Sequence, residues 1–428
     1  MLIQFSVENY RSILGRQTLS MAASKYFKEL EQFNTFEAGD VESVPRLLRS
    51  NVIYGPNASG KSTLVLALDF MRNRVINSAK ESQANENIPV EPFKLTATAR
   101  ASDSEFEVAF IEENVRYQYG FRCNKQRVTE EWLFAYPEGR SQKWFQRVFD
   151  PTSSKDEYRF NATFLGGRKR QDWKEQTRPN ALFLSTALQL NNAQLKPVLN
   201  WFQKRLRVIE ARQFLAPNYT MTRCRDEEQK RRVLEFLNSA DLSISDIHID
   251  TRVFSPDILP KDMSATLRDE VSQEMAGKEM MKATFLHEDI ESREPIEFSL
   301  DEESDGTRAL FAFAGPWLDV VENDRVLVVD ELDTSLHPLI VHYLVKLLHR
   351  QGRKAQIVFT THDTTILSQR ILRRDQIWFM EKDERNSTQL YPLSDFSPRD
   401  SEAIERGYLN GRYGGIPFLK DLDFYGQG

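Results

Sequence analysis

The sequence predicts an α/β protein in which a parallel sheet flanked by helices is split into two halves by an insertion. Residues 51–54 form a short apolar segment that runs into the glycine-rich segment 55–62, and apolar residues at helical spacing follow. Further apolar segments of strand length lie at 326–329, 355–360 and 376–380, with a helical pattern between the first two. Strands that alternate with helices are typical of a parallel sheet.

The composition is that of a globular protein without a membrane span. The chain has 428 residues, of which 40% are hydrophobic, enough for a buried core and roughly two or three domains. No run of about 18 apolar residues occurs, and the strand-like N-terminus with Glu8 does not suit a signal peptide. Two cysteines, Cys123 and Cys224, are too few for a disulfide framework or a zinc cluster. We therefore expect a soluble cytoplasmic protein.

The N-terminal part alternates between apolar and polar residues in the manner of strands. We predict an antiparallel β subdomain there, with a hairpin in its middle. The predicted strands are residues 3–7, 18–21, 106–110, 115–121 and 128–149, and the predicted loops are 31–48 and 150–180.

The middle of the chain is predicted to be a mainly helical insertion. Apolar residues between 195 and 209 recur at helical spacing, and residues 226–237 are charged on one face and apolar on the other. Neither pattern continues over several heptads, so no long coiled coil is expected. Residues 286–305 hold nine acids and one arginine and are predicted to be an acidic loop and strand, before a helix over 307–321. The predicted domains are residues 1–160, the first half of the split fold; 161–285, the insertion; and 286–428, the second half.

Charge is distributed unevenly along the chain. The whole chain carries a net charge of −6. Residues 164–232 hold 15 Lys and Arg against 6 Asp and Glu, which is +9, and the remainder is therefore −15. A basic segment on an acidic body can steer a polyanion such as nucleic acid to one face. The alternative is a solvated helical segment whose charges bind nothing.

Residues 55–62 match the pattern G-x-x-x-x-G-K-[ST] of a phosphate loop. Glycines let the backbone N–H groups and the following helix N-terminus approach a phosphate closely. In this pattern Lys61 reaches the β- and γ-phosphates and the Ser62 hydroxyl ligates magnesium. A chance match is the alternative, but the strand before and the helix after it favour a true phosphate loop. The candidate ATP-binding residues are Gly55, Asn57, Ala58, Ser59, Gly60, Lys61, Ser62 and Thr63.

A second candidate element is the pair Asp330 and Glu331, which follows the apolar segment 326–329. An acid at the end of a buried strand lies at the carboxyl edge of the sheet, beside the phosphates. There Asp330 would hold magnesium through water, and Glu331 would orient or deprotonate the attacking water. The alternative is a strand that ends in a solvated acidic pair, which the presence of a phosphate loop disfavours.

Two further segments have the composition of nucleotide contacts. Ser304 and Gly306 begin a helix and are similar to the S-x-G core of a signature segment that caps a γ-phosphate. In isolation a simple capping turn would explain them equally well, but the position of Gly306, 24 residues before Asp330, favours the signature segment. His362 follows the strand 355–360 and would face the same edge as Glu331, where it could sense the γ-phosphate and polarise water. Its alternative is a structural histidine.

With these motifs in this order, the sequence resembles an ABC-type ATPase of the RecF/SMC/OLD branch. The residues Asn9-Tyr10-Arg11-Ser12 and Asn57 also resemble that branch. The ending, residues 407–417, is similar to bacterial AAA-type ATP-binding proteins of abortive-infection, anti-phage and retron-associated operons.

The resemblance implies an ABC-ATPase head that uses ATP and Mg²⁺ and forms a homodimer or higher homo-oligomer. Two ATP molecules would lie at the dimer interface, each held by Lys61 of one chain and by Ser304 and Gly306 of the other. Asp333 would belong to the D-loop and His362 would be the switch histidine. The glutamine of the Q-loop is not clear: Gln118 and Gln189 are candidates, and Arg11 is a candidate contact of the phosphates.

The chain departs from OLD nucleases, which carry a C-terminal Toprim domain. Only 66 residues follow His362, too few for that domain together with the final strands, and the acids Glu381, Asp383 and Asp395 among them lack the expected D-x-D pairing. No other nuclease or metal pattern is evident. We therefore expect a separate effector protein, a nuclease or another toxin.

The leading functional hypothesis is the ATP-hydrolysing subunit of a bacterial anti-phage defence system. It would act as a dimeric sensor or switch that holds and then releases or activates the effector. The alternative is a RecF-like DNA-binding ATPase of DNA repair, with residues 164–232 as the contact surface. A third hypothesis is an assembly scaffold that binds ATP and scarcely hydrolyses it.

Overall fold

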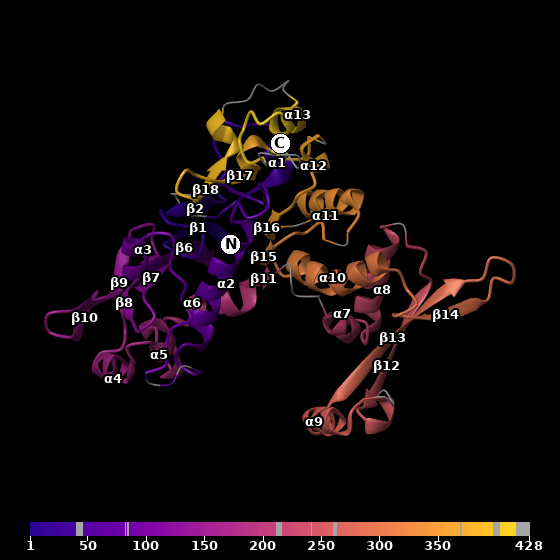
Figure 1. The fold of residues 1–428 in the computed structure, drawn as a ribbon, viewed down its shortest axis with the longest axis horizontal. Helices are drawn as coiled ribbons and strands as arrows, with labels where there is room; N and C mark the ends of the chain where they lie inside the picture. The colour runs from indigo at the N-terminus through magenta and orange to yellow at the C-terminus, as the bar shows by residue number, and fades with distance from the viewer. Residues whose placement is uncertain are drawn as a thin grey trace, which may run out of the picture. The chain divides into compact units, whose positions relative to one another are not determined.

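The computed structural model describes residues 1–39, 46–81, 83, 85–210, 216–240, 242–259, 263–334, 336–351, 353–368, 370–396 and 403–416. The chain forms two compact units (Figure 1). The first unit comprises Met1–Gln213, Val320–Thr334 and Leu344–Gly428, and the second comprises Phe214–Asp319 and Ser335–Tyr343. The predicted domains 1–160, 161–285 and 286–428 stay a prediction. No helix in the described part of the chain is long and apolar enough to cross a membrane.

The first unit contains the predicted antiparallel subdomain, a seven-stranded sheet in the order β10-β9-β8-β7-β6-β1-β2. Its strands pair antiparallel throughout, so this prediction is confirmed. The strands are β1 (Leu2–Glu8), β2 (Gln17–Ser20), β6 (Ser104–Glu112), β7 (Val115–Cys123), β8 (Val128–Tyr136), β9 (Gln142–Asp150) and β10 (Lys155–Phe160).

Two segments predicted as loops are in fact ordered elements. Residues 150–180 contain β10 and the helix α4 (Lys169–Gln176). Lys155, Glu157 and Arg159 of β10 are exposed, while Tyr158 and Phe160 pack against Phe183 at ring distances of 5.4 and 5.6 Å. Because these apolar residues are few and widely spaced, the composition resembled that of a loop. Residues 31–48 likewise contain α1 (Glu31–Asn34), β3 (Thr35–Glu37) and β4 (Arg46–Leu48).

The predicted parallel sheet is also present in the first unit, with six strands in the order β11-β15-β16-β5-β17-β18. All neighbours pair parallel except β17 and β18. Parallel pairing brings the carboxyl ends of β5, β15 and β16 to one edge. The strands are β5 (Ser50–Tyr54), β11 (Leu206–Ile209), β15 (Val326–Val329), β16 (Gln356–Thr360), β17 (Ile377–Lys382) and β18 (Thr388–Pro392).

The prediction of a helix between residues 195 and 209 is wrong for the second half of that range. The chain forms α6 (Lys196–Asn200), a π-helical turn over Trp201–Arg205 and then β11. Leu206 to Ile209 pair in register with Val326 to Val329 of β15. The backbone hydrogen bonds to β15 therefore override the helical spacing of the apolar side chains.

Several helices complete the first unit. α2 (Lys61–Asn77) follows the phosphate loop as predicted, and its apolar residues Leu64, Leu68, Met71 and Val75 are buried. The fold class, a mixed α/β architecture, is confirmed. The remaining short helices are α3 (Ala97–Ala101), α5 (Phe183–Gln189), α12 (Thr365–Ser368) and α13 (Ile404–Leu409).

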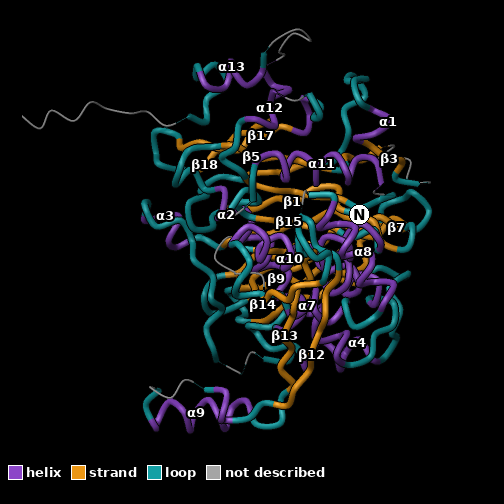
Figure 2. Tube along the Cα trace, turned by 90° about the vertical axis from the view of Figure 1, so that its right-hand side faces the viewer, coloured by secondary structure: helices purple, strands orange, loops and turns teal. Residues whose placement is uncertain are grey.

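The second unit is built on a three-stranded antiparallel sheet in the order β12-β13-β14. Figure 2 shows α9 at the far end of the β12–β13 hairpin. No long coiled coil occurs among the described residues, as predicted. The elements are α7 (Asn218–Arg223), α8 (Glu227–Asn238), β12 (Asp246–Val253), α9 (Ala265–Met275), β13 (Glu279–Glu288) and β14 (Pro295–Ser299). Two helices, α10 (Asp305–Glu322) and α11 (Pro338–Gln351), begin in this unit and end in the first.

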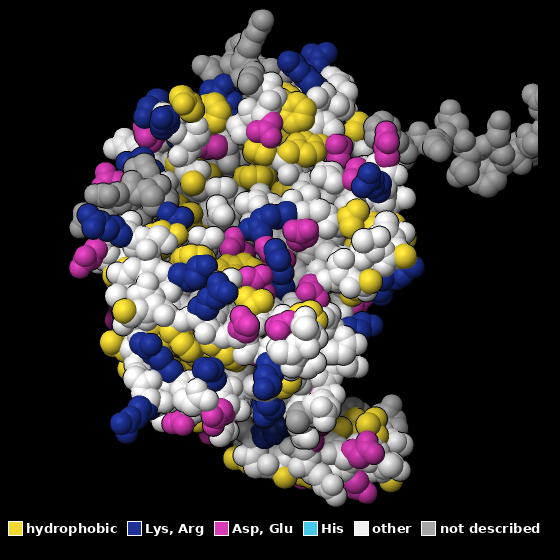
Figure 3. Space-filling view, turned by 90° about the vertical axis from the view of Figure 1, so that its left-hand side faces the viewer, with side chains coloured by type: hydrophobic (Ala, Val, Ile, Leu, Met, Phe, Trp, Pro, Cys, Tyr) yellow, Lys and Arg dark blue, Asp and Glu magenta, His cyan; other side chains and the backbone are white. Residues whose placement is uncertain are grey.

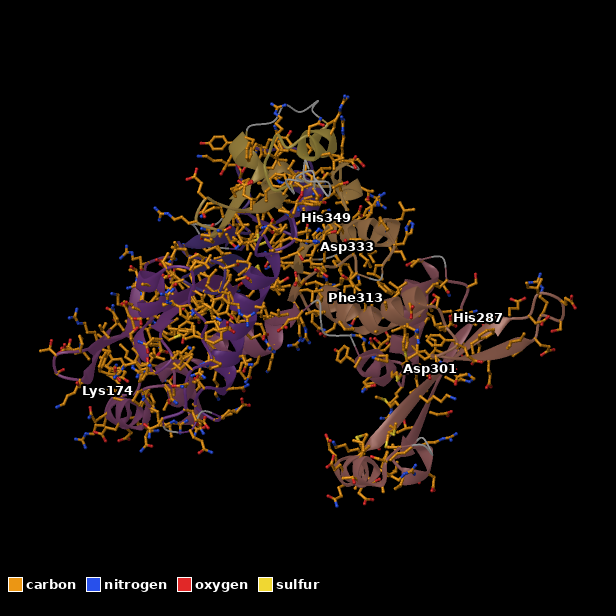
Figure 4. All side chains as sticks on the ribbon, viewed as in Figure 1. Lys174, His287, Asp301, Phe313, Asp333 and His349 are labelled. Carbon is orange, nitrogen blue, oxygen red and sulfur yellow. The ribbon has the colours of Figure 1, made fainter. Side chains whose placement is uncertain are left out.

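A buried histidine makes the first unit sensitive to acid. His349 (Figure 4) lies within hydrogen-bond distance of the Ser50 hydroxyl, 2.8 Å from it. Burial, and then the charge of Arg49, lower the pKa of His349 to about 3. Between about pH 6.5 and pH 3 the unfolded chain binds this proton and the folded chain does not, so folding stability falls as the pH falls.

We expect His349 alone to remove about 2 kcal/mol of unfolding free energy between pH 7 and pH 5. Urea unfolding of the parent and of His349→Gln at both pH values measures it. The variant keeps a hydrogen-bonding side chain that does not titrate, so its stability should fall less. An equal loss in both proteins would show that His349 is not responsible.

Candidate functional site

The phosphate loop connects β5 to α2, and its glycines are required by close packing. A Cβ at Gly55 would meet the backbone oxygen of Met380, and one at Gly60 would meet the Thr388 hydroxyl. Gly60 also has a φ of +111°, in the left-handed region that favours glycine. No side chain caps α2 at Gly60 among the described residues. The amides at the start of this helix can therefore face an anion, which fits a phosphate.

Lys61 is buried and its ammonium group is held by the loop itself. Its Nζ donates to the carbonyl oxygens of Gly55 and Pro56 at 2.7 and 3.2 Å. Burial lowers the pKa of Lys61, while the carboxylates of Asp330, Glu331 and Asp333 act in the opposite direction. The lysine therefore lies in the field of the acids that the sequence predicted as its neighbours.

Asp330 and Glu331 lie at the end of β15 and share one partner. The Thr360 hydroxyl donates to Asp330 Oδ1 at 2.7 Å and accepts the backbone N–H of Glu331 at 2.7 Å. Glu331 has a φ of +53°, which is uncommon for a residue other than glycine. The Thr334 hydroxyl donates to Glu331 Oε2 at 3.2 Å. The position of Glu331 is thus fixed both by its backbone and by its carboxylate.

The loop after β15 and the loop after β16 meet through Asp333, which Figure 4 labels. The backbone N–H of His362 donates to Asp333 Oδ2 at 3.2 Å. Asp333 Oδ1 is buried and has no hydrogen-bond partner in the described part of the chain. The His362 side chain is exposed. The structure therefore brings together Lys61, Asp330, Glu331, Asp333 and His362 at one edge of the parallel sheet.

A cluster of polar side chains beneath the phosphate loop was missed by the sequence analysis. The Ser12 hydroxyl donates to Thr63 Oγ1 at 3.0 Å and lies 2.9 Å from Thr388 Oγ1. Thr388 in turn donates to the Ser59 carbonyl at 2.7 Å and accepts from Lys382 Nζ at 2.9 Å. Burial lowers the pKa of Lys382. Ser12 lies in the Asn-Tyr-Arg-Ser segment, residues 9–12, so that motif could have identified it. No sequence motif identifies Thr388.

Glu210 was missed because β11 was predicted as helix. It directly follows Ile209, whose carbonyl oxygen accepts the backbone N–H of Asp330 at 2.9 Å. Glu210 therefore lies at the same sheet edge as Asp330. Its pKa is raised, first by burial and then by the charge of Asp69.

Ser304 and Gly306 are exposed at the start of α10, in the second unit. The Ser304 hydroxyl accepts the backbone N–H of Thr307 at 3.1 Å and lies 2.9 Å from its hydroxyl. This is the geometry of a helix cap. The role of both residues in binding a phosphate stays a prediction.

The remaining candidates are spread over the first unit. Arg11 forms an ion pair with Glu91 at 3.4 Å and lines a cavity of about 330 Å³ beside α2. Gln118 lies on β7 and donates to Glu107 at 3.0 Å, and Gln189 ends α5. Neither glutamine follows a strand of the parallel sheet. Pro417 of the predicted C-terminal motif and Ser335 after Asp333 lie outside the described residues.

Among solved structures, the chain is similar to three SMC heads. One is the SMC head domain from Thermotoga maritima, at 12% identity and a TM-score of 0.37, covering 91% of this chain and 98% of that one. The second is an SmcHead bound to the C-winged helix domain of ScpA, at 12% identity and a TM-score of 0.40, covering 91% and 97%. The third is an Smc head domain with an extended coiled coil bound to the C-terminal domain of ScpA derived from Pyrococcus furiosus, at 11% identity and a TM-score of 0.41, covering 92% and 97%. Likenesses this distant carry no inference about partners or activity.

The comparison with curated proteins found no match. A family model, described as "AAA domain, putative AbiEii toxin, Type IV TA system", matches residues 50–368. The match begins in β5, ends in α12 and includes the phosphate loop, Asp330, Glu331 and His362. It covers well over half of the chain. The chain therefore belongs to this family of AAA domains and is an ATP-binding protein of the ATPase class.

Proposed function

We propose that the protein binds and hydrolyses Mg·ATP as a dimeric switch in a bacterial anti-phage defence system. One observation carries the ATPase part: the phosphate loop, the acids after β15 and the loop of His362 converge at one edge of the parallel sheet.

The phosphate loop supplies the binding surface for ATP. The backbone amides of the loop and of the α2 N-terminus would hold the phosphates, and Lys61 would exchange its carbonyl partners for phosphate oxygens. Ser62 is exposed at the first turn of α2 and, together with Asp330, would hold magnesium. Bound magnesium would neutralise phosphate charge and polarise the phosphoryl group. Oxygen ligands of this kind suit that ion.

Glu331 is the group proposed to act on the attacking water. Its left-handed backbone and its bond to Thr334 hold the carboxylate beside the phosphate loop. His362 would contact the γ-phosphate or the water from the neighbouring strand end. The D-loop residue Asp333 would link the two, since it already accepts the His362 N–H.

The dimer is proposed to close around two ATP molecules. Ser304 and Gly306 of one chain would complete the site formed by Lys61 of the other. The exposure of both residues at a helix N-terminus supports this proposal, because helix N-termini attract anions. ATP would then join two chains, and hydrolysis would release them.

A charged substitution at Ser304 tests the dimer. We expect Ser304→Asp to keep the cap of α10, because aspartate caps as well as serine, but to repel the partner's γ-phosphate. In the Glu331→Gln background with Mg·ATP, the parent should sediment as a dimer of two 49.8 kDa chains, and the Ser304→Asp protein as a monomer.

Ser264→Asp is the matched control for that experiment. Ser264 caps α9 in the same unit, where its side chain accepts the Leu267 N–H. This variant should dimerise like the parent. If Ser304→Asp dimerised equally well, Ser304 would have no role at the interface.

The defence role is supported by the family, whose description names a "putative AbiEii toxin" and a "Type IV TA system". We propose that the effector is a separate protein, a nuclease or another toxin, which the ATP-bound dimer holds and then releases or activates. Purification of the tagged protein with the products of its neighbouring genes tests this. A preparation that is toxic or nucleolytic on its own, with nothing bound, would contradict it.

DNA repair of the RecF type is the second candidate, and the net charge of residues 164–232 favours it. Those residues are divided between the two units. On the face in Figure 3, lysines and arginines lie among aspartates and glutamates. Ion pairs in the first unit include Arg16–Glu107 and Arg122–Glu105, at 2.5 and 2.7 Å. A salt titration separates the candidates: RecF-like binding should require ATP and weaken steeply with salt.

A further inference from the structure

The C-terminal segment 403–416 contributes no residue to the proposed nucleotide site, yet it contacts the loop that carries His362. The segment contains α13 and a glycine-rich turn, and both belong to the first unit. In Figure 1, α13 lies beside α12, the helix that begins three residues after His362. Residues 407–416 of this segment belong to the motif that resembles bacterial AAA-type ATP-binding proteins, and ATP binding does not explain that motif.

Two side chains hold the residues that directly follow His362. Glu405 of α13 accepts a hydrogen bond from the Thr364 hydroxyl at 3.1 Å. The Tyr54 hydroxyl, at the end of β5, donates to the Asp363 carbonyl at 3.0 Å. The His362 N–H itself is bound to Asp333. Each of the three successive residues 362–364 is therefore held by a hydrogen bond, and the bond at Thr364 comes from α13.

Aromatic packing fastens α13 to the parallel sheet. The Tyr408 ring stacks on Phe379 of β17 at 5.2 Å and lies 5.5 Å from Tyr54. Its hydroxyl donates to the Gly415 carbonyl at 2.8 Å, and burial raises its pKa to about 12. Tyr408 is thus a neutral, buried anchor at physiological pH.

The glycine-rich turn closes this attachment. The Gly415 N–H donates to Glu381 Oε2 at 2.9 Å, and the Tyr391 hydroxyl donates to the Tyr413 carbonyl at 3.0 Å. Gly414 has a φ of +67°, and a Cβ there would meet the Tyr391 hydroxyl and the Glu381 carboxylate. The motif therefore encodes a docked turn, which places Glu405 opposite Thr364.

We infer that Glu405 is a positioning residue for hydrolysis: through Thr364 it holds the loop 361–364, and so His362, at the edge of the sheet. The inference rests on the proposed function, since it requires that His362 acts on bound ATP. The anchor is already supplied by Tyr408 and the turn, so the bond from Glu405 to Thr364 is not needed to dock α13. What that bond adds is a fixed distance between α13 and the loop of His362.

The size of the effect follows from the geometry of catalysis. A displacement of about 1 Å in a reacting group costs up to about 100-fold in rate. Other hydrogen bonds also restrain the loop, among them the one from the Thr361 N–H to the Ile53 carbonyl at 3.3 Å, so we expect a smaller loss, of about 5- to 20-fold. The affinity for ATP should be unchanged, because Glu405 contacts no residue of the phosphate loop in the structure described.

Four single variants test the bond by single-turnover hydrolysis of radiolabelled Mg·ATP with protein in excess. Glu405→Ala and Thr364→Val each remove it and should slow hydrolysis by about 5- to 20-fold, with Kd for ATP within twofold of the parent. Glu405→Gln and Thr364→Ser keep an acceptor and a donor and should hydrolyse at close to the parental rate. Glu175→Ala is the matched control, since Glu175 on α4 also accepts one side-chain hydrogen bond, from Gln171 at 2.6 Å.

A double variant separates positioning from general structural damage. If Glu405 acts through His362, the change Glu405→Ala should slow ATP hydrolysis when it is made in the parent. When the same change is made in the His362→Ala protein, it should cause no further slowing. An equal slowing in both backgrounds would overturn the inference, and so would parental rates for both Glu405→Ala and Thr364→Val.

The same series shows which proposal has failed. Parental hydrolysis by His362→Ala would contradict the role of His362 in the proposed function and remove the basis of this inference. Slow hydrolysis by His362→Ala together with fast hydrolysis by Glu405→Ala would leave the proposed function intact and overturn the inference alone.

Discussion

Glu331→Gln is expected to bind Mg·ATP with the parental affinity and to hydrolyse it at least 100-fold more slowly. The amide has nearly the same shape as the carboxylate, so it can occupy the same backbone position and still accept the Thr334 hydroxyl. It cannot accept a proton from water at neutral pH. General-base catalysis is worth about 100- to 10,000-fold, which sets the expected loss.

Two measurements on the same preparation test this prediction: Kd for ATP by calorimetry, and the single-turnover rate. Glu291→Gln, an exposed residue of the second unit, is the control for the same chemical change. Because ATP would persist, the variant should accumulate as the closed dimer. Parental turnover by Glu331→Gln would show that another group activates the water, and Glu210 at the same sheet edge would be the first to examine.

Much of the site could be predicted because its parts are local in sequence. The phosphate loop is eight consecutive residues, and Asp330 and Glu331 directly follow an apolar strand. Parallel pairing of β5, β16 and β15 then fixes where these segments meet, since strand ends of a parallel sheet share an edge. Local patterns together with one rule of sheet topology thus predicted that edge.

The parts that could not be predicted depend on contacts between distant residues. Ser12 and Thr388 are 376 positions apart and meet because β18 lies beside the phosphate loop. Leu206 and Ile209 of β11 continue an apolar spacing that also suits a helix, and pairing with β15 decides between strand and helix. Glu210 was missed for that reason, and the contact of Glu405 with Thr364 was missed because neither residue belongs to a known motif.

Lys61→Ala is expected to weaken ATP binding by about 100-fold. The lysine is the cation of the phosphate loop, and hydrogen bonds to charged groups contribute about 1.5–3 kcal/mol each. Its Nζ is bound to the carbonyls of Gly55 and Pro56, so the group is already placed at the loop and needs little rearrangement to meet a phosphate. Burial lowers its pKa, but Asp330, Glu331 and Asp333 oppose that shift and favour the charged form.

Calorimetry with Mg·ATP measures this loss, and thermal unfolding checks that the variant folds. Lys346→Ala, which removes an exposed lysine of α11, is the control and should bind like the parent. The pair of variants at this site also separates two roles: Lys61→Ala should lose binding, whereas Glu331→Gln should lose turnover alone. If both bound ATP like the parent, the phosphates would have to be held without the lysine, and the assignment of residues 55–62 as the binding loop would be wrong.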